Sequence, residues 1–523
     1  MLLGSIHDTP PVSLKVTGME TLQNLVDSTS NGLWRVLAYV LVAAGLYFCV
    51  RTIVVQLRYI PAMFSAITEK PSQAESGKDG ISAFKAFTIS AASRVGTGNV
   101  AGVAIAVTAG GPGAVFWMWA LATIGGATSF VESTLAQVYK VRDTDSYRGG
   151  PAYYITKALG WKWLATIFAV LITITYGFVF NAVQSNSIAG SVATSFDSLD
   201  PHTVHLVVGG VIAALTAAVI FGGVQRIASV TQIIVPVMAV LYIIVGLIVV
   251  ALNITEVPSM IAHIVENAFG IRQFGGATLG YVIMTGVKRG LFSNEAGMGS
   301  VPNAAATASV SHPAKQGLIQ TLGVYFDTIV VCSITSFIIL LADPSVTDSD
   351  GIAVTQNALA DSVGTWGIHF LTMVILFLAF SSIIGNYYYG EANIEFLTGS
   401  KTVLWGVRAL VVLCVFGGAL GTVPLVWSLA DVFSALMVFV NLLAIVPLCG
   451  VAVAVLKNFT VQRVAGLNPI FRREDVPGLR GWDGMECWDG SDPLTHTTPE
   501  YEPVLAQARA EFLADRTKDT TAS

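Results

Sequence analysis

The chain has 523 residues, of which 54% are hydrophobic and only 12% are charged, and its mean hydropathy is +0.68. Soluble domains carry about 25% charged residues, so an ordinary soluble globule is excluded, and the apolar content excludes a disordered chain. The net charge of −5 gives no indication of nucleic-acid binding. The class that remains is an all-α protein with many membrane-spanning helices.

The sequence contains eleven apolar runs long enough to cross about 30 Å of hydrocarbon. In chain order they cover 34–56, 83–108, 113–138, 161–190, 203–222, 228–252, 279–300, 313–342, 365–390, 402–421 and 428–456. Lys and Arg gather in every second connection; the one from span 1 to span 2, for example, carries Arg58, Lys70 and Lys78. The positive-inside rule then places the N-terminus outside and the C-terminus inside.

Spans 2 and 7 differ from the others because they are rich in glycine and polar residues. Span 2 contains RVGTGN (94–99), and span 7 contains GVKRGLFSNEAGMG (286–299). Glycine weakens a helix by about 1 kcal/mol, and unwound backbone is tolerated in a membrane only where it is buried or lines a cavity. We therefore expect both helices to be broken. Close packing through small residues is the alternative explanation for these glycines.

The two broken spans lie five spans apart, so they run in opposite directions through the membrane. This predicts two inverted five-helix repeats, the arrangement that places a transporter site at the repeat interface. The domains expected are an extracellular N-terminal arm, an extra transmembrane helix, the first repeat (spans 2–6), the second repeat (spans 7–11) and a cytoplasmic tail. They cover 1–33, 34–56, 83–252, 279–456 and 457–523.

A broken helix offers two complementary surfaces to a ligand. The N-terminus of one half presents N–H groups and about half a positive charge, which suits a carboxylate, and the carbonyls of the other half suit Na⁺ or an ammonium group. Two such helices can hold a zwitterion. We assign the carboxylate side to Thr97 and Asn99 with the backbone of Gly96 and Gly98.

Polar residues in two further spans extend this site. Gln184 in span 4 can both donate and accept hydrogen bonds, although it could also fix helix packing alone. Ser381 and Ser382 in span 9 could bind Na⁺ together with carbonyls of span 2, among them that of Gly96. The alternative for both serines is a hydrogen bond from the hydroxyl to a carbonyl one turn earlier.

Several charged residues fall within or near apolar runs, where such groups usually pair with each other or face water. We expect structural or gating pairs between three cations and three carboxylates, namely Arg94, Lys288 and Arg289 with Glu132, Glu295 and Asp327. The spans contain no GxSxG, no HExxH and no aspartyl dyad, so the sequence does not predict an enzyme or a bound cofactor.

At these motifs the chain resembles the alanine or glycine:cation symporter family. The resemblance is carried by SRVGTGNVAGVA (93–104), GGPGAVFWMW (110–119), YRGGPAYYI (147–155), NAVQSNSIAG (181–190), GVKRGLFSNEAGMGSVPNAAATA (286–308) and AFSSIIGNYYYGE (379–391). It implies a LeuT-like fold and sodium-coupled uptake of small neutral amino acids, typically alanine or glycine. It also implies substrate contacts from spans 2, 4, 7 and 9, at Thr97, Asn99, Gln184, the broken part of span 7 with Gly286 and Gly290, Ser382, Ile383 and position 386.

Position 386 departs from the family pattern, because many members have Trp where this chain has Asn386. Loss of a large apolar wall predicts a wider and more polar pocket that accepts serine, threonine or glutamine.

These observations together predict a secondary active sodium symporter in the plasma (inner) membrane that imports small neutral amino acids by alternating access. A proton-coupled carrier of the same fold, with Glu295 or Asp327 as the titrating group, is the nearest alternative. A channel would need a continuous lined pore, which two broken helices in opposed halves do not favour.

Overall fold

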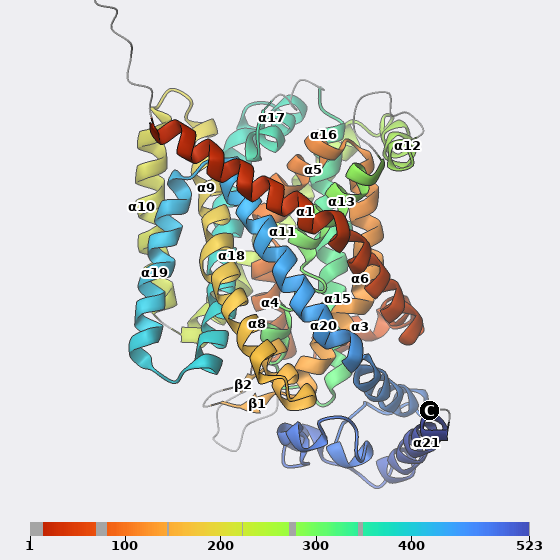
Figure 1. Ribbon diagram of the computed structural model, residues 1–523. Helices are drawn as coiled ribbons and strands as arrows, with labels where there is room; N and C mark the ends of the chain where they lie inside the picture. Colours follow the sequence, from red (N-terminus) through yellow and green to blue (C-terminus); the bar gives the residue numbers. More distant parts are fainter. Residues whose placement is uncertain are drawn as a thin grey trace, which may run out of the picture.

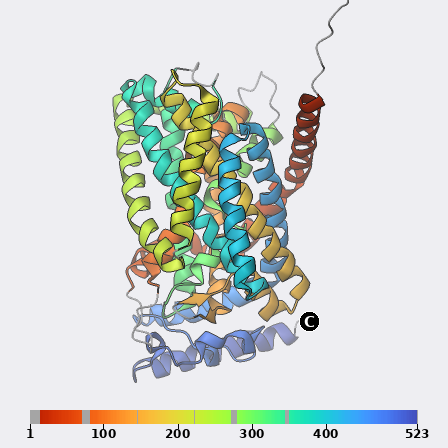
Figure 2. The ribbon, with the colours of Figure 1, turned by 90° about the vertical axis from the view of Figure 1, so that its left-hand side faces the viewer.

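The protein is an upright bundle of helices with a layer of short elements across one end (Figure 1). The computed structural model describes residues 14–69, 81–143, 146–221, 223–270, 279–343 and 349–521. Lys70 and Lys78, which contribute to the predicted charge pattern of the loops, lie outside these residues. Figure 2 shows the C-terminal layer beneath the bundle, and we call this end of the bundle the tail end.

Nine helical stretches among the described residues are long and apolar enough to cross a membrane. They are formed by α1 (Leu14–Arg51), α6 (Gly113–Val138), α8 (Lys162–Ile174) with η3 (Thr175–Val179) and α9 (Phe180–Ser195), α10 (Pro201–Ile220), α11 (Gly223–Leu252), α15 (Pro313–Val324) with η4 (Tyr325–Cys332) and α16 (Ser333–Leu340), α18 (Trp366–Leu397), α19 (Lys401–Leu420) and α20 (Val423–Val464). Each overlaps one of the predicted spans.

The other two predicted spans are both interrupted, so neither forms one long helix. Span 2 consists of α4 (Ala83–Arg94), the π-helical segment η1 (Gly98–Gly102) and α5 (Val103–Gly110). Span 7 consists of α13 (Leu279–Asn294) and, after an irregular stretch, α14 (Pro302–Ala305). The total of eleven spans and their orientation in a membrane stay predictions.

Shorter elements cover the two ends of the bundle. Those outside the tail are α2 (Val55–Arg58), α3 (Ile60–Ile67), the hairpin of β1 (Val141–Arg142) and β2 (Tyr147–Arg148), α7 (Pro151–Tyr154), η2 (Ile155–Leu159), α12 (Val257–Ala268) and α17 (Ile352–Val363). The two strands pair antiparallel, with Val141 opposite Arg148. Helix α12 buries Met260, Ile264 and Ala268 along one face.

The outer surface of the bundle is apolar, and its interior holds many buried polar side chains within a hydrophobic core. Leu206 and Val211 of α10, Ile233 and Val240 of α11 and Leu413 of α19 are all exposed. A soluble monomer does not present such a surface, but a lipid bilayer requires it.

The two interrupted helices lie next to each other inside this bundle. Helix α13 packs against η1, α5 and α6, and α18 packs against α4 and α9. The long helices α6 and α15, each of which follows an interrupted helix in the chain, pack against one another.

The tail folds onto the tail end through η6 (Arg473–Asp475), η7 (Trp482–Gly484), η8 (Glu486–Trp488), η9 (Pro493–Thr495) and α21 (Tyr501–Thr521). The indole Nε1 of Trp488 donates to the carbonyl of Gln137 at 2.9 Å, and the hydroxyl of Tyr139 donates to the carbonyl of Arg480 at 2.5 Å. These contacts attach the tail to the last turn of α6.

Candidate functional site

The first interruption lies at Val95 and Gly96, where α4 ends and the chain turns into η1. Val95 is extended, with φ −82° and ψ 92°, so the helical hydrogen bonds stop there. Gly96 has no room for a side chain, because an added Cβ would collide with Ser382 Oγ and come within 3.0 Å of Gln184 Oε1. The glycine therefore allows spans 4 and 9 to approach the backbone of span 2.

Asn99 holds this interruption in shape. Its Oδ1 accepts a hydrogen bond from the backbone N–H of Gly96 at 2.9 Å. Its Nδ2 donates to Ser293 Oγ at 3.0 Å and to Asp327 Oδ1 at 2.6 Å. The side chain thus ties span 2 to both span 7 and span 8, at full burial.

Gln184 contacts the same turn from span 4. Its Oε1 accepts a hydrogen bond from the backbone N–H of Thr97 at 3.1 Å. The hydroxyl oxygen of Thr97 is buried and has no hydrogen-bond partner among the described residues. The amide of Gly96, whose backbone the sequence assigns to a carboxylate, is in this structure bound by Asn99, and the amide of Thr97 is bound by Gln184.

The predicted residues of span 9 lie on α18 and are fully buried. Ser381 and Ser382 lie within hydrogen-bond distance of the carbonyl of Leu378, at 2.8 and 3.0 Å, and Ser382 also lies 2.7 Å from the carbonyl of Ala92. The carbonyl of Ala92 and the hydroxyl of Ser382 are therefore two oxygen atoms in contact across spans 2 and 9. Ile383 follows them and is buried.

Asn386 lies one turn further along α18, beside the end of α4. Its Oδ1 lies 2.6 Å from Ser93 Oγ, and its buried Nδ2 has no partner within the described part of the chain. The structure thus brings Gly96, Thr97, Asn99, Gln184, Ser382 and Asn386 together around the first interruption, with the backbone of Gly98 against the ring of Phe292.

The second interruption lies in the C-terminal part of the predicted glycine-rich run, 286–299, and not at its first glycines. Helix α13 continues through Gly286 and Gly290 and ends at Asn294. An added Cβ at Gly286 would lie 2.5 Å from the carbonyl oxygen of Ala114, and one at Gly290 would lie 3.3 Å from Met118, both on α6. These two glycines permit close packing of helices, and the structure does not bring them to the site.

The irregular stretch runs from Glu295 to Val301. Glu295, Gly297 and Gly299 all have positive φ angles, of 58°, 95° and 79°. Glycine adopts this conformation without cost, but for a glutamate it is unusual, and such residues cluster at functional sites.

Glu132 of α6 holds the second interruption. Its carboxylate accepts hydrogen bonds from the backbone N–H of Gly297 at 3.1 Å, from that of Gly299 at 3.2 Å and from Asn441 Nδ2 at 2.8 Å. All three partners are donors, which is the arrangement that suits an ionised carboxylate. Since Asn441 lies on α20, one side chain joins three segments.

Asp327 plays the corresponding part at the first interruption. Its carboxylate accepts hydrogen bonds from Asn99 at 2.6 Å, from Ser293 Oγ at 2.6 Å and from Thr328 Oγ1 at 2.9 Å. In each half of the chain, the span that follows the interrupted helix therefore sends a buried carboxylate to the interruption of the other half. The two carboxylates thus occupy corresponding places in the two halves.

The pairs predicted between charged residues are not those found. Lys288 and Arg289 both pair with Asp431 of α20, at 2.9 and 2.5 Å. Arg94 donates to the carbonyl of Gln320 at 3.2 Å and forms no ion pair among the described residues. The carboxylate of Glu295 is bound by the hydroxyls of Ser93 and Ser300, at 2.8 and 2.6 Å. The prediction was wrong because it omitted Asp431, which lies 142 residues from Arg289 in the chain.

An aromatic cluster packs against the first interruption at Gly98 and Gly102. The ring of Phe292 lies 4.7 Å from that of Phe180 and 4.8 Å from that of Trp427, and the guanidinium of Arg289 lies 5.0 Å from the Trp427 ring. Spans 4, 7 and 11 thus meet beside the first interruption through large side chains. The sequence predicts neither this aromatic cluster nor the ion pairs of Asp431.

The arrangement can bind a small zwitterion and a cation. It offers backbone amides beside Gln184 and Asn99, hydroxyl and carbonyl oxygens at Ser382 and Ala92, and buried polar atoms without partners. Two interrupted helices that meet at buried polar groups are typical of helical membrane transporters, since irregular backbone in a membrane is tolerated only where it is buried in protein or lines a cavity.

Comparisons with known proteins agree with this class. The model of the sodium:alanine symporter family matches residues 19–473. The amino-acid carrier protein AlsT of Bacillus subtilis is 52% identical over 473 residues, which cover 90% of this chain and 99% of AlsT. The probable sodium/glutamine symporter GlnT of the same organism is 48% identical, with coverages of 91% and 98%.

More distant matches extend the comparison to other organisms and to a solved structure. The sodium/alanine symporter AgcS of Methanococcus maripaludis is 39% identical, with coverages of 84% and 98%. The crystal structure of MhsT in complex with L-phenylalanine shares the fold, with a TM-score of 0.50, 12% identity and coverages of 85% and 99%. The chain belongs to the sodium:alanine symporter family, whose members are cation-coupled amino-acid symporters.

Proposed function

We propose that the protein imports small neutral amino acids together with Na⁺ by alternating access. The observation that carries the proposal is the meeting of two interrupted helices with Gln184 of span 4 and Ser382 of span 9 at one buried point. In this proposal the N-terminus lies outside the cell, the tail lies in the cytoplasm, and the two inverted repeats cover 83–252 and 279–456.

The amino acid binds at the first interruption. Its carboxylate takes the backbone amides of Gly96 and Thr97, and Gln184 and Asn99 give up their hydrogen bonds to those amides as it arrives. The released Gln184 side chain can then bind the ammonium group through its oxygen. This exchange replaces two internal hydrogen bonds by two stronger ones to a charged group.

Asn386 sets the width and polarity of the pocket around the substrate side chain. Its Nδ2 is buried without a partner in the described structure, so it can donate to a hydroxyl or amide oxygen of the substrate. The proposal therefore includes serine, threonine and glutamine beside alanine as substrates.

Na⁺ binds between spans 2 and 9. Ser381 and Ser382 can both direct their hydrogens to the carbonyl of Leu378, which leaves the lone pairs of both hydroxyl oxygens for an ion. The carbonyls of Ala92 and Gly96 complete an all-oxygen set, of which the sequence identified all but Ala92. A cation at this place joins α18 to the end of α4, so it prepares the first interruption for the substrate.

The gradients of a bacterial cell are sufficient for this transport. One Na⁺ that moves inward through about 100 mV releases about 2.3 kcal/mol, and a tenfold Na⁺ gradient adds about 1.4 kcal/mol. The sum of about 3.7 kcal/mol concentrates a neutral solute about 500-fold.

Uptake of labelled L-alanine into proteoliposomes tests the proposal. The vesicles receive an inward Na⁺ gradient, or a K⁺ gradient of the same size, each with and without a pH gradient. The proposal predicts uptake with Na⁺ alone, which unlabelled serine and glutamine reduce by competition. Uptake that follows the pH gradient and ignores Na⁺ would refute sodium coupling.

A proton-coupled carrier is the second candidate, and one observation favours it. Ser93 Oγ lies 2.8 Å from Glu295 Oε1 and 2.6 Å from Asn386 Oδ1, but a hydroxyl has only one hydrogen to donate. Either Glu295 carries a proton, or Asn386 presents its amide nitrogen to Ser93. If proton coupling operates through Glu295, the variant Glu295→Gln retains exchange of alanine but loses accumulation driven by pH. An unchanged response to the pH gradient in this variant contradicts that role.

A further inference from the structure

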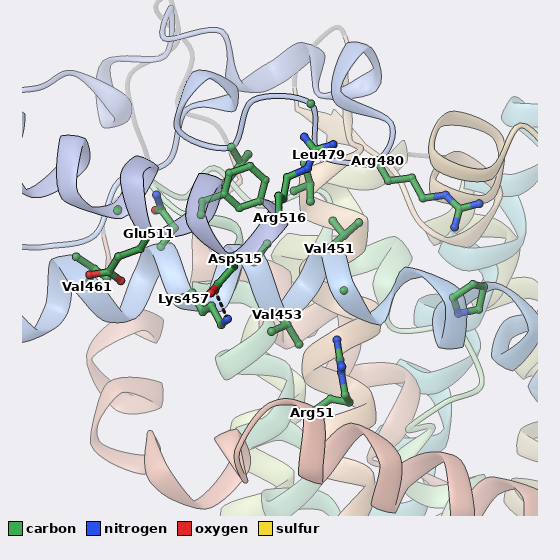
Figure 3. A pocket seen from close by; sticks show the side chains of 18 residues that line it. Arg51, Val451, Val453, Lys457, Val461, Leu479, Arg480, Glu511, Asp515 and Arg516 are labelled. Atoms are coloured by element: carbon green, nitrogen blue, oxygen red, sulfur yellow. Dashed lines mark hydrogen bonds and ion pairs between the residues drawn. The ribbon is translucent and has the colours of Figure 1, made fainter. Parts of the chain in front are cut away.

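A cavity of about 390 Å³ lies at the tail end of the bundle (Figure 3), and none of its lining residues belongs to an interrupted helix. Helix α20 forms one wall, α21 and the segment that precedes η7 form the other, and Arg51 at the end of α1 contributes to the rim. A second cavity of about 400 Å³ shares Arg51 and Lys457 with it and adds Arg58. We call the two together the tail cleft.

The wall on α20 is an apolar stripe that extends out of the membrane-spanning part of the helix. Its members Pro447, Val451, Ala454 and Val461 recur at the spacing of one helix face. Pro447 is exposed, and Gly450 beside it leaves open space, with no atom within 4 Å of an added Cβ. The stripe therefore joins the lipid-facing surface of the bundle to the rim of the cleft.

Cationic side chains dominate the rim. Arg51, Lys457, Arg480 and Arg516 line the first cavity, against the two carboxylates of Glu511 and Asp515, which leaves a surplus of two positive charges.

The charges of the rim are only partly paired. Lys457 pairs with Asp515 at 2.6 Å, and both side chains are about half-exposed. Arg51 points from α1 toward α20 (Figure 3) and forms no ion pair within the described ranges. A cation at the end of a spanning helix without a carboxylate partner is placed to meet an anion at the membrane surface.

We propose that the tail cleft binds an anionic phospholipid. The phosphate group lies against Arg51 and Lys457, and one acyl chain follows the exposed part of this wall from Ala454 past Gly450 to Pro447 into the bilayer. Two features support a lipid over a soluble anion, namely the continuity of the cleft with the lipid-facing surface and the apolar character of the α20 wall. Basic pockets beside membrane-spanning helices bind anionic headgroups by the same chemistry.

The bound lipid would join α1, α20 and the tail, which contribute to the cleft from distant parts of the chain. The proposal requires the membrane setting of the protein but not any particular substrate or coupling ion. A cleft that binds no lipid would leave the transport proposal intact. A protein that transports no amino acid with Na⁺ would likewise leave the lipid proposal intact.

Native mass spectrometry of the full-length protein in detergent tests the proposal. The probes are phosphatidylglycerol, phosphatidylcholine with the same acyl chains, and inorganic phosphate. The double variant Arg51→Gln/Lys457→Gln removes two cations from the cleft. The control Lys162→Gln/Lys401→Gln removes two exposed cations from the first residues of α8 and α19, outside the cleft.

We expect phosphatidylglycerol to bind more tightly than phosphatidylcholine to the unaltered protein. The cleft variant should lose about 30-fold in affinity for it, equivalent to about 2 kcal/mol at about 1 kcal/mol per cation, while the control should lose little. Equal losses in both variants, or equal binding of the two lipids, would overturn the proposal.

The variant Gly450→Leu separates a lipid from a free anion, because it narrows the apolar path and leaves every charge in place. It should weaken phosphatidylglycerol and leave any binding of inorganic phosphate unchanged. If phosphate alone binds in the cleft and competes with the lipid regardless of this variant, the site is one for a soluble anion and the lipid proposal fails.

Discussion

Glu132→Gln tests whether a buried carboxylate holds the second interruption in its binding conformation. In the structure, Glu132 Oε1 accepts from Gly297, and Oε2 accepts from both Gly299 and Asn441. Glutamine keeps the size of the side chain but has one acceptor oxygen instead of two. The change therefore removes one acceptor without opening a cavity.

The magnitude follows from these three bonds. If the glutamine oxygen keeps Gly299 and Asn441, its NH₂ group faces the N–H of Gly297, and that donor has no acceptor. A buried donor left in this state costs about 1–3 kcal/mol. If alanine binds only when Glu132 holds the second interruption in this conformation, the apparent affinity for alanine falls by about 5- to 150-fold.

The assay is the concentration dependence of alanine uptake in proteoliposomes, with thermal unfolding as a measure of the fold. Glu391→Gln is the matched control, because it breaks a bond of 2.7 Å to Arg408 and contacts neither interruption. The control should lose stability without a change in alanine affinity. A Glu132→Gln protein that folds and takes up alanine with unchanged concentration dependence would refute the bracing role.

Four further outcomes are expected. Asn386→Trp should narrow the substrate range, so that glutamine and threonine no longer compete with alanine; an unchanged competition profile would count against the pocket assignment. Gly96→Ala should abolish uptake because its Cβ collides with spans 4 and 9, whereas Gly406→Ala, with open space at its Cβ, should be active. Asp431→Asn leaves two buried cations without a partner, and we expect a loss of stability of about 3–5 kcal/mol in thermal unfolding. Burial raises the pKa of Asp475 in the tail to about 6, so the folded tail should become more stable as the pH falls from 7 toward 4. Amide hydrogen exchange, corrected for intrinsic rates, measures this stability. A tail that loosens over this range would contradict the raised pKa of Asp475.

The sequence predicted the framework because its signals are local. Nine of the eleven apolar runs overlap one long helical stretch of the described residues, and RVGTGN gives an interruption at Val95 and Gly96, where glycine meets polar residues with no apolar periodicity. Helix α1 begins earlier than predicted, at Leu14, because polar residues do not end a helix by themselves.

The second interruption shows where local signals are insufficient. Glycines at 286, 290, 297 and 299 look alike in the sequence, yet the first pair packs against α6 and the second pair adopts positive φ angles. The difference depends on Ala114, Met118 and Glu132, which lie on another span. For the same reason Asp431, Asn441 and the contacts of the tail could not be assigned from patterns within single spans.

The central claim is that an amino acid and Na⁺ bind at the same pair of interrupted helices and stabilise each other. The direct test is to measure the dissociation constant of L-alanine in Na⁺ and in K⁺, and that of Na⁺ with and without L-alanine, on one purified preparation. Because coupling between two sites is reciprocal, the account predicts that each ligand tightens the other by the same factor. Affinity for alanine that is identical in Na⁺ and K⁺, with Na⁺ binding indifferent to alanine, would contradict it.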